Sequence, residues 1–136
     1  MARRAADLTG EEVAFLTERH LGTLTTLRAD GTPHVVAIAF TVDLEAGVVR
    51  IITSDGGQKV RNIEGGGRAA VCQVDGPRWL TLEGPAVVTR DSERIGAAVT
   101  GFEARYHPAR ENPERVAIEI TVRRVLGPVA RRPRQV

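Results

Sequence analysis

A chain of 136 residues with 42% apolar and 26% charged residues has the composition of an ordinary globular domain. The sequence has no apolar stretch long enough to cross a bilayer and no signal-type segment near its start. Its single cysteine excludes an internal disulfide framework. We therefore expect one cytoplasmic domain over residues 1–136, with an ordered core from about residue 9 to residue 127.

The first half of the chain predicts a helix followed by a β-meander. Thr9 and Glu12 have the spacing of a capping box, and apolar residues follow at helical spacing, which predicts a helix over residues 10–19. Turn residues then separate runs that are rich in threonine, valine, leucine and isoleucine. These runs predict strands at residues 21–27, 33–42 and 48–53.

The second half alternates helices and strands. A short helix is expected over residues 58–64, between two groups of glycines, and a longer one opens at Asp91 and continues to about Tyr106. Further strands are predicted at residues 68–74, 79–89 and 116–122. The chain is therefore mainly β with short helices. Closing its six strands into a small barrel would leave no exposed sheet edge.

Arginines gather near both ends of the chain, although the net charge is only +2. Residues 128–136 form a basic tail, and such a tail can bind nucleic acid. This one has no interleaved aromatic residues, so we interpret it as a solvated tail. We expect no nucleic-acid partner and no membrane partner.

The segment from Thr53 to Asn62 is the best candidate for a ligand site. Glycines before a helix let the backbone approach a ligand closely, and the helix start offers free N–H groups that favour an anion. Lys59 follows this turn and is the only lysine beside 18 arginines. A compact ammonium can sit against a phosphate where a planar guanidinium fits less well. Read alone, the segment is also compatible with an ordinary glycine turn before a surface helix.

Other candidates carry weaker signals. The three histidines, His20, His34 and His107, lack the spacing of metal ligands, so we expect no metal. Trp79 could be a core residue, stack on a planar ring or fill a subunit interface. No catalytic residue can be assigned from the spacing of side chains.

Several short strings, taken together and in order, resemble a known family. The chain is similar to the pyridoxamine-phosphate-oxidase-like split-barrel superfamily, and within it to the actinobacterial flavin/deazaflavin oxidoreductases of the B group. The resemblance extends from about Thr9 to Gly127. The strings that carry it include residues 15–21, 24–30, 33–37, 52–53, 58–59, 73–76, 78–80, 82–84, 115–116 and 124–127.

The resemblance implies an FMN-binding type of split barrel and a homodimer with two cofactor sites at the subunit interface. It implies that the strand near residue 34 flanks the ring system and that Trp79 comes from the other subunit. The phosphate would be held around Lys59. The cofactor-binding residues implied are Pro33, His34, Val35, Val36, Thr53, Ser54, Gln58, Lys59, Arg61, Asn62 and Trp79.

The expected cofactor is the deazaflavin coenzyme F420, with FMN as the alternative. Some relatives carry a basic residue two positions before the lysine, where this chain has Gly57. Flavin-using oxidases of the superfamily have a richer basic phosphate site, which favours the deazaflavin.

The activity that the resemblance implies is hydride transfer from reduced F420 to a conjugated acceptor. Biliverdin is the first candidate, reduced at its central methine bridge to bilirubin. Its propionates need cationic partners, for which we expect Arg28 and Arg78. An FMN-dependent oxidase and a non-catalytic carrier of flavin, deazaflavin or haem are the alternative functions.

Overall fold

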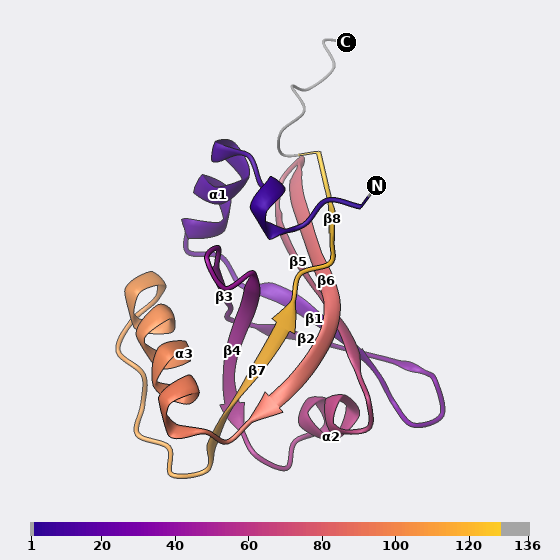
Figure 1. The fold of residues 1–136 in the computed structure, drawn as a ribbon, viewed down its shortest axis with the longest axis vertical. Helices are drawn as coiled ribbons and strands as arrows, with labels where there is room; N and C mark the ends of the chain where they lie inside the picture. Colours follow the sequence, from indigo (N-terminus) through magenta and orange to yellow (C-terminus); the bar gives the residue numbers. More distant parts are fainter. Residues whose placement is uncertain (1, 129–136) are drawn as a thin grey trace.

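Two antiparallel sheets that share one long strand form the body of the molecule (Figure 1). The computed structural model describes residues 2–128, so residues 129–136 of the predicted basic tail lie outside the described part. The strand order is β2-β1-β5-β6-β7-β4-β3, and β8 pairs with β6. The strands are β1 (Gly22–Leu27), β2 (Pro33–Ile38), β3 (Thr41–Asp43), β4 (Val48–Ser54), β5 (Arg68–Asp75), β6 (Arg78–Thr89), β7 (Arg115–Thr121) and β8 (Arg124–Leu126).

The helices lie around these sheets. Figure 1 shows α2 below β1 and β2, and α3 alongside β4 and β7, while α1 lies at the opposite end from α2. No helix among the described residues is long and apolar enough to span a membrane. The helical elements are a short 3-10 helix (Ala5–Asp7), α1 (Gly10–Thr17), α2 (Gln58–Glu64) and α3 (Ser92–Arg105).

Local sequence signals account for the helix starts. The predicted capping box is confirmed, because the Glu12 N–H donates to Thr9 Oγ1 at 3.1 Å and the Thr9 N–H donates to Glu12 Oε1 at 2.9 Å. Asp91 caps α3 by accepting a hydrogen bond from the Arg94 N–H. Helix α1 ends at Thr17, two residues before the predicted end.

The predicted count of six strands is wrong, because the described residues contain eight. The run expected as one strand over residues 33–42 breaks into β2 and β3 at Phe40. The backbone of Phe40 bonds instead to two side chains at the end of α3. Tyr106 Oη accepts a hydrogen bond from the Phe40 N–H, and Arg105 donates to the Phe40 C=O at 2.6 Å. Strand β8 was missed because three residues carry little alternation.

The shared strand β6 changes sheets at Gly84 and Pro85. Its first part pairs with β5, and from Ala86 it pairs with β7. A Cβ on Gly84 would lie only 1.8 Å from the Thr121 carbonyl oxygen, so only glycine lets the end of β7 pass this close. Gly84 and Pro85 therefore form a crossing point between the two sheets.

Replacing Gly84 with alanine should destabilise the fold by about 1–3 kcal/mol, the usual cost of overpacking a rigid site. Urea unfolding measures this change in the free energy of unfolding. Gly96→Ala is the matched control, because Gly96 lies in the middle of α3 with open space around it. It should stabilise by about 0.5–1 kcal/mol. Equal effects at both positions would contradict the crossing-point role of Gly84.

Candidate functional site

The junction between β4 and α2 has the backbone expected of a ligand-binding turn. Gly56 has a φ of 81°, which favours glycine, and Gly57 is the N-cap of α2 without a side-chain cap. The first N–H groups of α2 therefore have no side-chain acceptor among the described residues. This leaves donors at the strand-to-helix junction that the sequence singled out.

A chain of hydrogen bonds orders the side chains on one face of α2. Arg61 donates to the Gly56 carbonyl at 2.6 Å and to Gln58 Oε1 at 2.7 Å. Gln58 Nε2 donates to Asn62 Oδ1 at 2.7 Å, and Asn62 Nδ2 donates to Thr26 Oγ1 at 3.0 Å. The structure therefore brings three predicted site residues together and links them to the sheet through β1.

These side chains border a groove of about 690 Å³, which we call the α2 groove. Its cations are Arg28, Arg61 and Arg68, and no carboxylate lines it in the part of the chain that the structure describes. Arg28 also donates to the Pro33 carbonyl at 2.6 Å, so it steadies the turn between β1 and β2. The groove suits an anionic ligand. Its lining residues are Leu27, Arg28, Ala29, Gln58, Arg61, Asn62, Gly65, Gly66, Gly67 and Arg68.

The predicted residues of β2 divide between the two faces of the sheet. His34 pairs with the buried Thr26 and faces the interior with Val36, whereas Pro33 and Val35 face outward. The Nδ1 atom of His34 is buried and has no hydrogen-bond partner among the described residues. Because Thr26 also accepts from Asn62, this free ring nitrogen belongs to the same polar region as the α2 side chains.

The remaining predicted residues of the segment lie elsewhere around α2. Lys59 is half-buried and lies about 100° around the helix from Gln58. It lines neither the α2 groove nor the groove described next. Thr53 and Ser54 line a second groove of about 380 Å³ between β4 and α3, which we call the α3 groove. Its lining residues are Ile52, Thr53, Ser54, Phe102, His107, Ala109, Arg110, Asn112 and Arg115.

Arg78 and Trp79 lie at the far end of the β5–β6 hairpin. Trp79 pairs with Val74, six residues along β5 from Arg68, which lines the α2 groove. Six residues of extended strand span about 20 Å. Within one subunit, therefore, Trp79 and Arg78 do not join the other predicted site residues.

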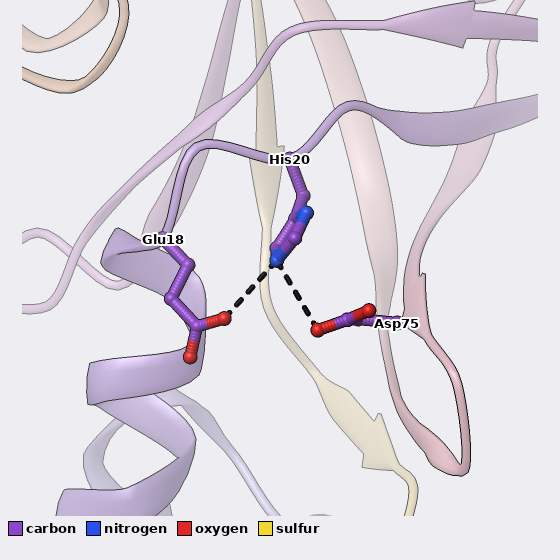
Figure 2. Close-up of side chains that lie close together, drawn as sticks. All are labelled: Glu18, His20 and Asp75. Carbon is purple, nitrogen blue, oxygen red and sulfur yellow. Dashed lines mark hydrogen bonds and ion pairs between the residues drawn. The ribbon is translucent and has the colours of Figure 1, made fainter.

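Arg78 belongs to an ion-pair cluster that the sequence did not reveal. Its guanidinium donates to both oxygens of Glu18, at 2.8 and 2.9 Å, and to Asp75. Figure 2 shows His20 between the same two carboxylates, with Nε2 3.0 Å from Glu18 Oε1 and 3.6 Å from Asp75 Oδ2.

The cluster has the donor atoms of a cation site but already contains a cation. One ligand atom each from Glu18, His20 and Asp75 lies within 4.8 Å of the others. Hydrogen bonds from Arg78 and then from His20 lower the pKa of Glu18 to about 2. Since the guanidinium compensates the two carboxylates, we interpret the cluster as a structural link between the α1–β1 connection and the β5–β6 hairpin.

Comparison of the sequence with known families identifies the family of this chain. The family described as pyridoxamine 5′-phosphate oxidase matches residues 8–127. The chain belongs to this family. The resemblance predicted from the sequence is thereby confirmed, together with a mainly β split-barrel fold.

Individual relatives agree with this assignment. The F420H2-dependent biliverdin reductase of Mycobacterium tuberculosis (strain CDC 1551 / Oshkosh) is 47% identical over 127 residues, which cover 93% of each chain. A solved F420 reductase is 28% identical, with a TM-score of 0.70 over 88% of this chain and 98% of its own. A conserved hypothetical protein from Mycobacterium tuberculosis has a TM-score of 0.74 at 22% identity, over 100% of this chain and 96% of its own.

Sequence reasoning missed the basic residues that complete both grooves. Arg68 follows the glycines after α2, and Arg110 and Arg115 lie in and after the loop that follows α3. Arg68 and Arg110 belong to none of the strings that carry the resemblance, and only the fold brings the three arginines to the grooves. The sole signal in the sequence is that they are arginines placed near turns.

The cluster predicts a specific pH dependence of stability. A carboxyl whose pKa falls on folding stabilises the protein above its ordinary pKa of 4.5, and this contribution is lost as the pH falls toward about 2. The stability difference between the wild type and Glu18→Gln should therefore shrink as the pH falls from about 5 toward 2. Urea unfolding at several pH values measures it. Glu45→Gln, at an exposed turn position without a salt bridge in the described chain, should show no such change. A stability difference for Glu18→Gln that does not change with pH would refute the structural link.

Proposed function

We propose that this protein is an F420-dependent reductase that transfers a hydride to biliverdin, which also takes up one proton and becomes bilirubin. The observation that carries the proposal is the 47% identity, over 93% of both chains, with a relative named for this reaction. A solved F420 reductase with the same fold supports the choice of cofactor. The groove geometry of this chain supplies the physical argument.

The residues present fit an anionic, planar cofactor. Within residues 2–128, the α2 groove offers cations without carboxylates, and the first turn of α2, which no side chain caps, offers N–H donors. The buried Nδ1 of His34 has no hydrogen-bond partner in this part of the chain, which leaves a polar group on the strand proposed to flank the ring. We assign phosphate contacts to Gln58, Arg61 and Asn62 in the α2 groove and to Thr53, Ser54 and Lys59 around the β4–α2 turn. We assign ring contacts to Pro33, His34, Val35 and Val36 of β2.

Reduced F420 supplies a hydride from a carbon of its deazaflavin ring. The work of the protein is then to place the acceptor and to exclude competing reactions. Arg28 faces the α2 groove and is the better candidate for a propionate of biliverdin. Arg78 would first have to leave Glu18 and Asp75.

A second copy of the chain would complete the site. The face of the sheet that points away from the core carries large apolar side chains that are exposed in the single subunit, including Val74 at 59%, Val35 at 57% and Trp79 at 38%. Between them lie uncharged residues of β1 and β5. We call this the outer apolar face, and its exposed members are Leu27, Val35, Val74, Trp79 and Leu126.

An apolar surface of this kind marks a protein contact. Since Trp79 lies about 20 Å from the α2 groove of its own subunit, it can reach a cofactor site only from the partner of a dimer. We therefore propose a homodimer with two sites, each of which receives Trp79 from the other subunit.

One competing function has specific support. The family is named for an oxidase, and an FMN enzyme would use the same strand and the same turn. A carrier without activity would use them as well. Purified protein separates these readings, because an FMN enzyme retains a yellow flavin, whereas a deazaflavin enzyme made in a host without F420 is colourless.

The direct test is a paired titration with F420 and FMN, followed by turnover of biliverdin with reduced F420. We expect F420 binding and bilirubin formation. Lys59→Ala should weaken F420 binding at least about tenfold, because a charge-assisted contact to phosphate is lost. Lys59→Arg keeps the charge but not the compact ammonium, so it should recover only part of this loss. Tight FMN binding with negligible F420 affinity would contradict the proposal, and F420 binding without turnover would indicate a carrier.

The dimer is tested by charge substitution on the outer apolar face. Val35→Glu should convert the dimer to a monomer in light scattering coupled to size exclusion, because the carboxylate would be buried at the interface. The fold should survive, since Val35 is exposed in the subunit. Leu44→Glu, at an exposed apolar position in the turn before β4, should leave the dimer intact. A wild-type protein that elutes as a monomer would overturn this arrangement.

A further inference from the structure

The α3 groove lies beside the predicted phosphate cradle but is formed by different elements. Thr53 and Ser54, at the end of β4, form one wall. Phe102 of α3 and residues of the loop after α3 form the other. Because β4 continues directly into Gly56 and Gly57, the two strand-end residues border both the groove and the turn before α2.

The charges of the α3 groove are of one sign. Arg110 and Arg115 line it, and no carboxylate does so among residues 2–128. Many other arginines of this chain pair with acids, as Arg90 does with Asp55 at 2.7 Å. Neither groove arginine forms a salt bridge in the described structure, even though Glu111 and Glu114 are their neighbours in sequence. The groove therefore holds two uncompensated guanidinium groups.

Two contacts give this groove a defined shape. Asn112 Nδ2 donates to Ser54 Oγ at 2.9 Å, which fastens the loop to the end of β4. Arg115 donates to the Arg110 carbonyl, so it also closes the loop on itself. The Ser54 hydroxyl hydrogen and the Arg110 guanidinium form no hydrogen bond within the described residues and can donate to a ligand.

The rest of the wall is apolar. Ile52, Ala109 and the Phe102 ring line the groove, and His107 packs edge-on against that ring with centroids 5.2 Å apart. A ligand with carboxylates on aliphatic stems matches this combination, because the stem packs on the apolar wall while the carboxylate meets a guanidinium.

We propose that the α3 groove is a carboxylate-binding subsite, held by Arg110 and Arg115, for the ligands of the adjacent reductase site; this rests on the proposed function. Two such ligands carry carboxylates on flexible stems. Biliverdin has two propionates, and F420 has an oligo-γ-glutamyl tail beyond its phosphate. The subsite also supplies the second cation for a tetrapyrrole that Arg78, engaged by Glu18 and Asp75, does not offer.

The experiment compares the wild type, Arg110→Glu and Arg110→Lys by direct binding. Four ligands are titrated: F420 with its tail, the F420 precursor without glutamates, biliverdin, and biliverdin dimethyl ester. Arg110→Glu should raise the Kd of a carboxylate ligand at least about tenfold and leave its counterpart without those carboxylates unchanged. Arg110→Lys should recover most of the loss. Arg110 is exposed, so the fold should be unaffected.

Arg123→Glu is the matched control, because Arg123 is exposed, forms no salt bridge within residues 2–128 and lines neither groove. Weaker binding of tailed F420 alone assigns the subsite to the cofactor tail, and weaker binding of biliverdin but not of its ester assigns it to the propionates. Equal effects on both members of a pair, or no effect on any ligand, would overturn the subsite.

Failure of the proposed function can be distinguished from failure of the subsite. A wild type that binds F420 but neither binds nor reduces biliverdin refutes the proposed reaction, and the two F420 forms then decide the subsite alone. A wild type that binds neither F420 nor biliverdin overturns both. Reduction of biliverdin with unchanged Kd values in Arg110→Glu leaves the reaction standing and removes the subsite.

Discussion

The sharing of β6 by two sheets is the constraint on which the rest of the structure depends. The strand can serve both sheets only because Gly84 has no side chain where the end of β7 passes over it. With β6 in place, β2 and β4 lie far apart in the strand order. Helix α2 leads from β4 back to β5 and contacts β1 and β6, so it connects the two sheets.

The buried side chain of Arg105 holds together the end of the molecule opposite α2. Arg105 of α3 donates to the carbonyls of Glu18 and Phe40 and to the Gln73 side chain. One guanidinium therefore joins α3 to the α1–β1 connection, to the β2–β3 connection and to β5. Burial lowers the pKa of Arg105. The same contacts fix the backbone of Glu18, whose side chain binds Arg78 next to Trp79 at the turn of the β5–β6 hairpin.

The sequence predicts most of what is local in this fold and little of what is not. Thr9 and Asp91 mark helix starts because an N-cap is satisfied by residues within one turn. The break at Phe40 could not be predicted, because the groups that compete for its backbone belong to residues 105 and 106. The cluster of Glu18, His20 and Asp75 was missed for the same reason.

The proposed site residues differ in the same way: some lie in one short segment, and others are brought together only by the fold. All of the proposed phosphate contacts fall within residues 53–62, so a short string can carry them through a family. The residues proposed for the acceptor come from a turn, from the loop after α3 and from the hairpin of a proposed second subunit, which no single string contains. Similarity within the phosphate segment therefore constrains the phosphate contacts of the cofactor more strongly than the site of the acceptor.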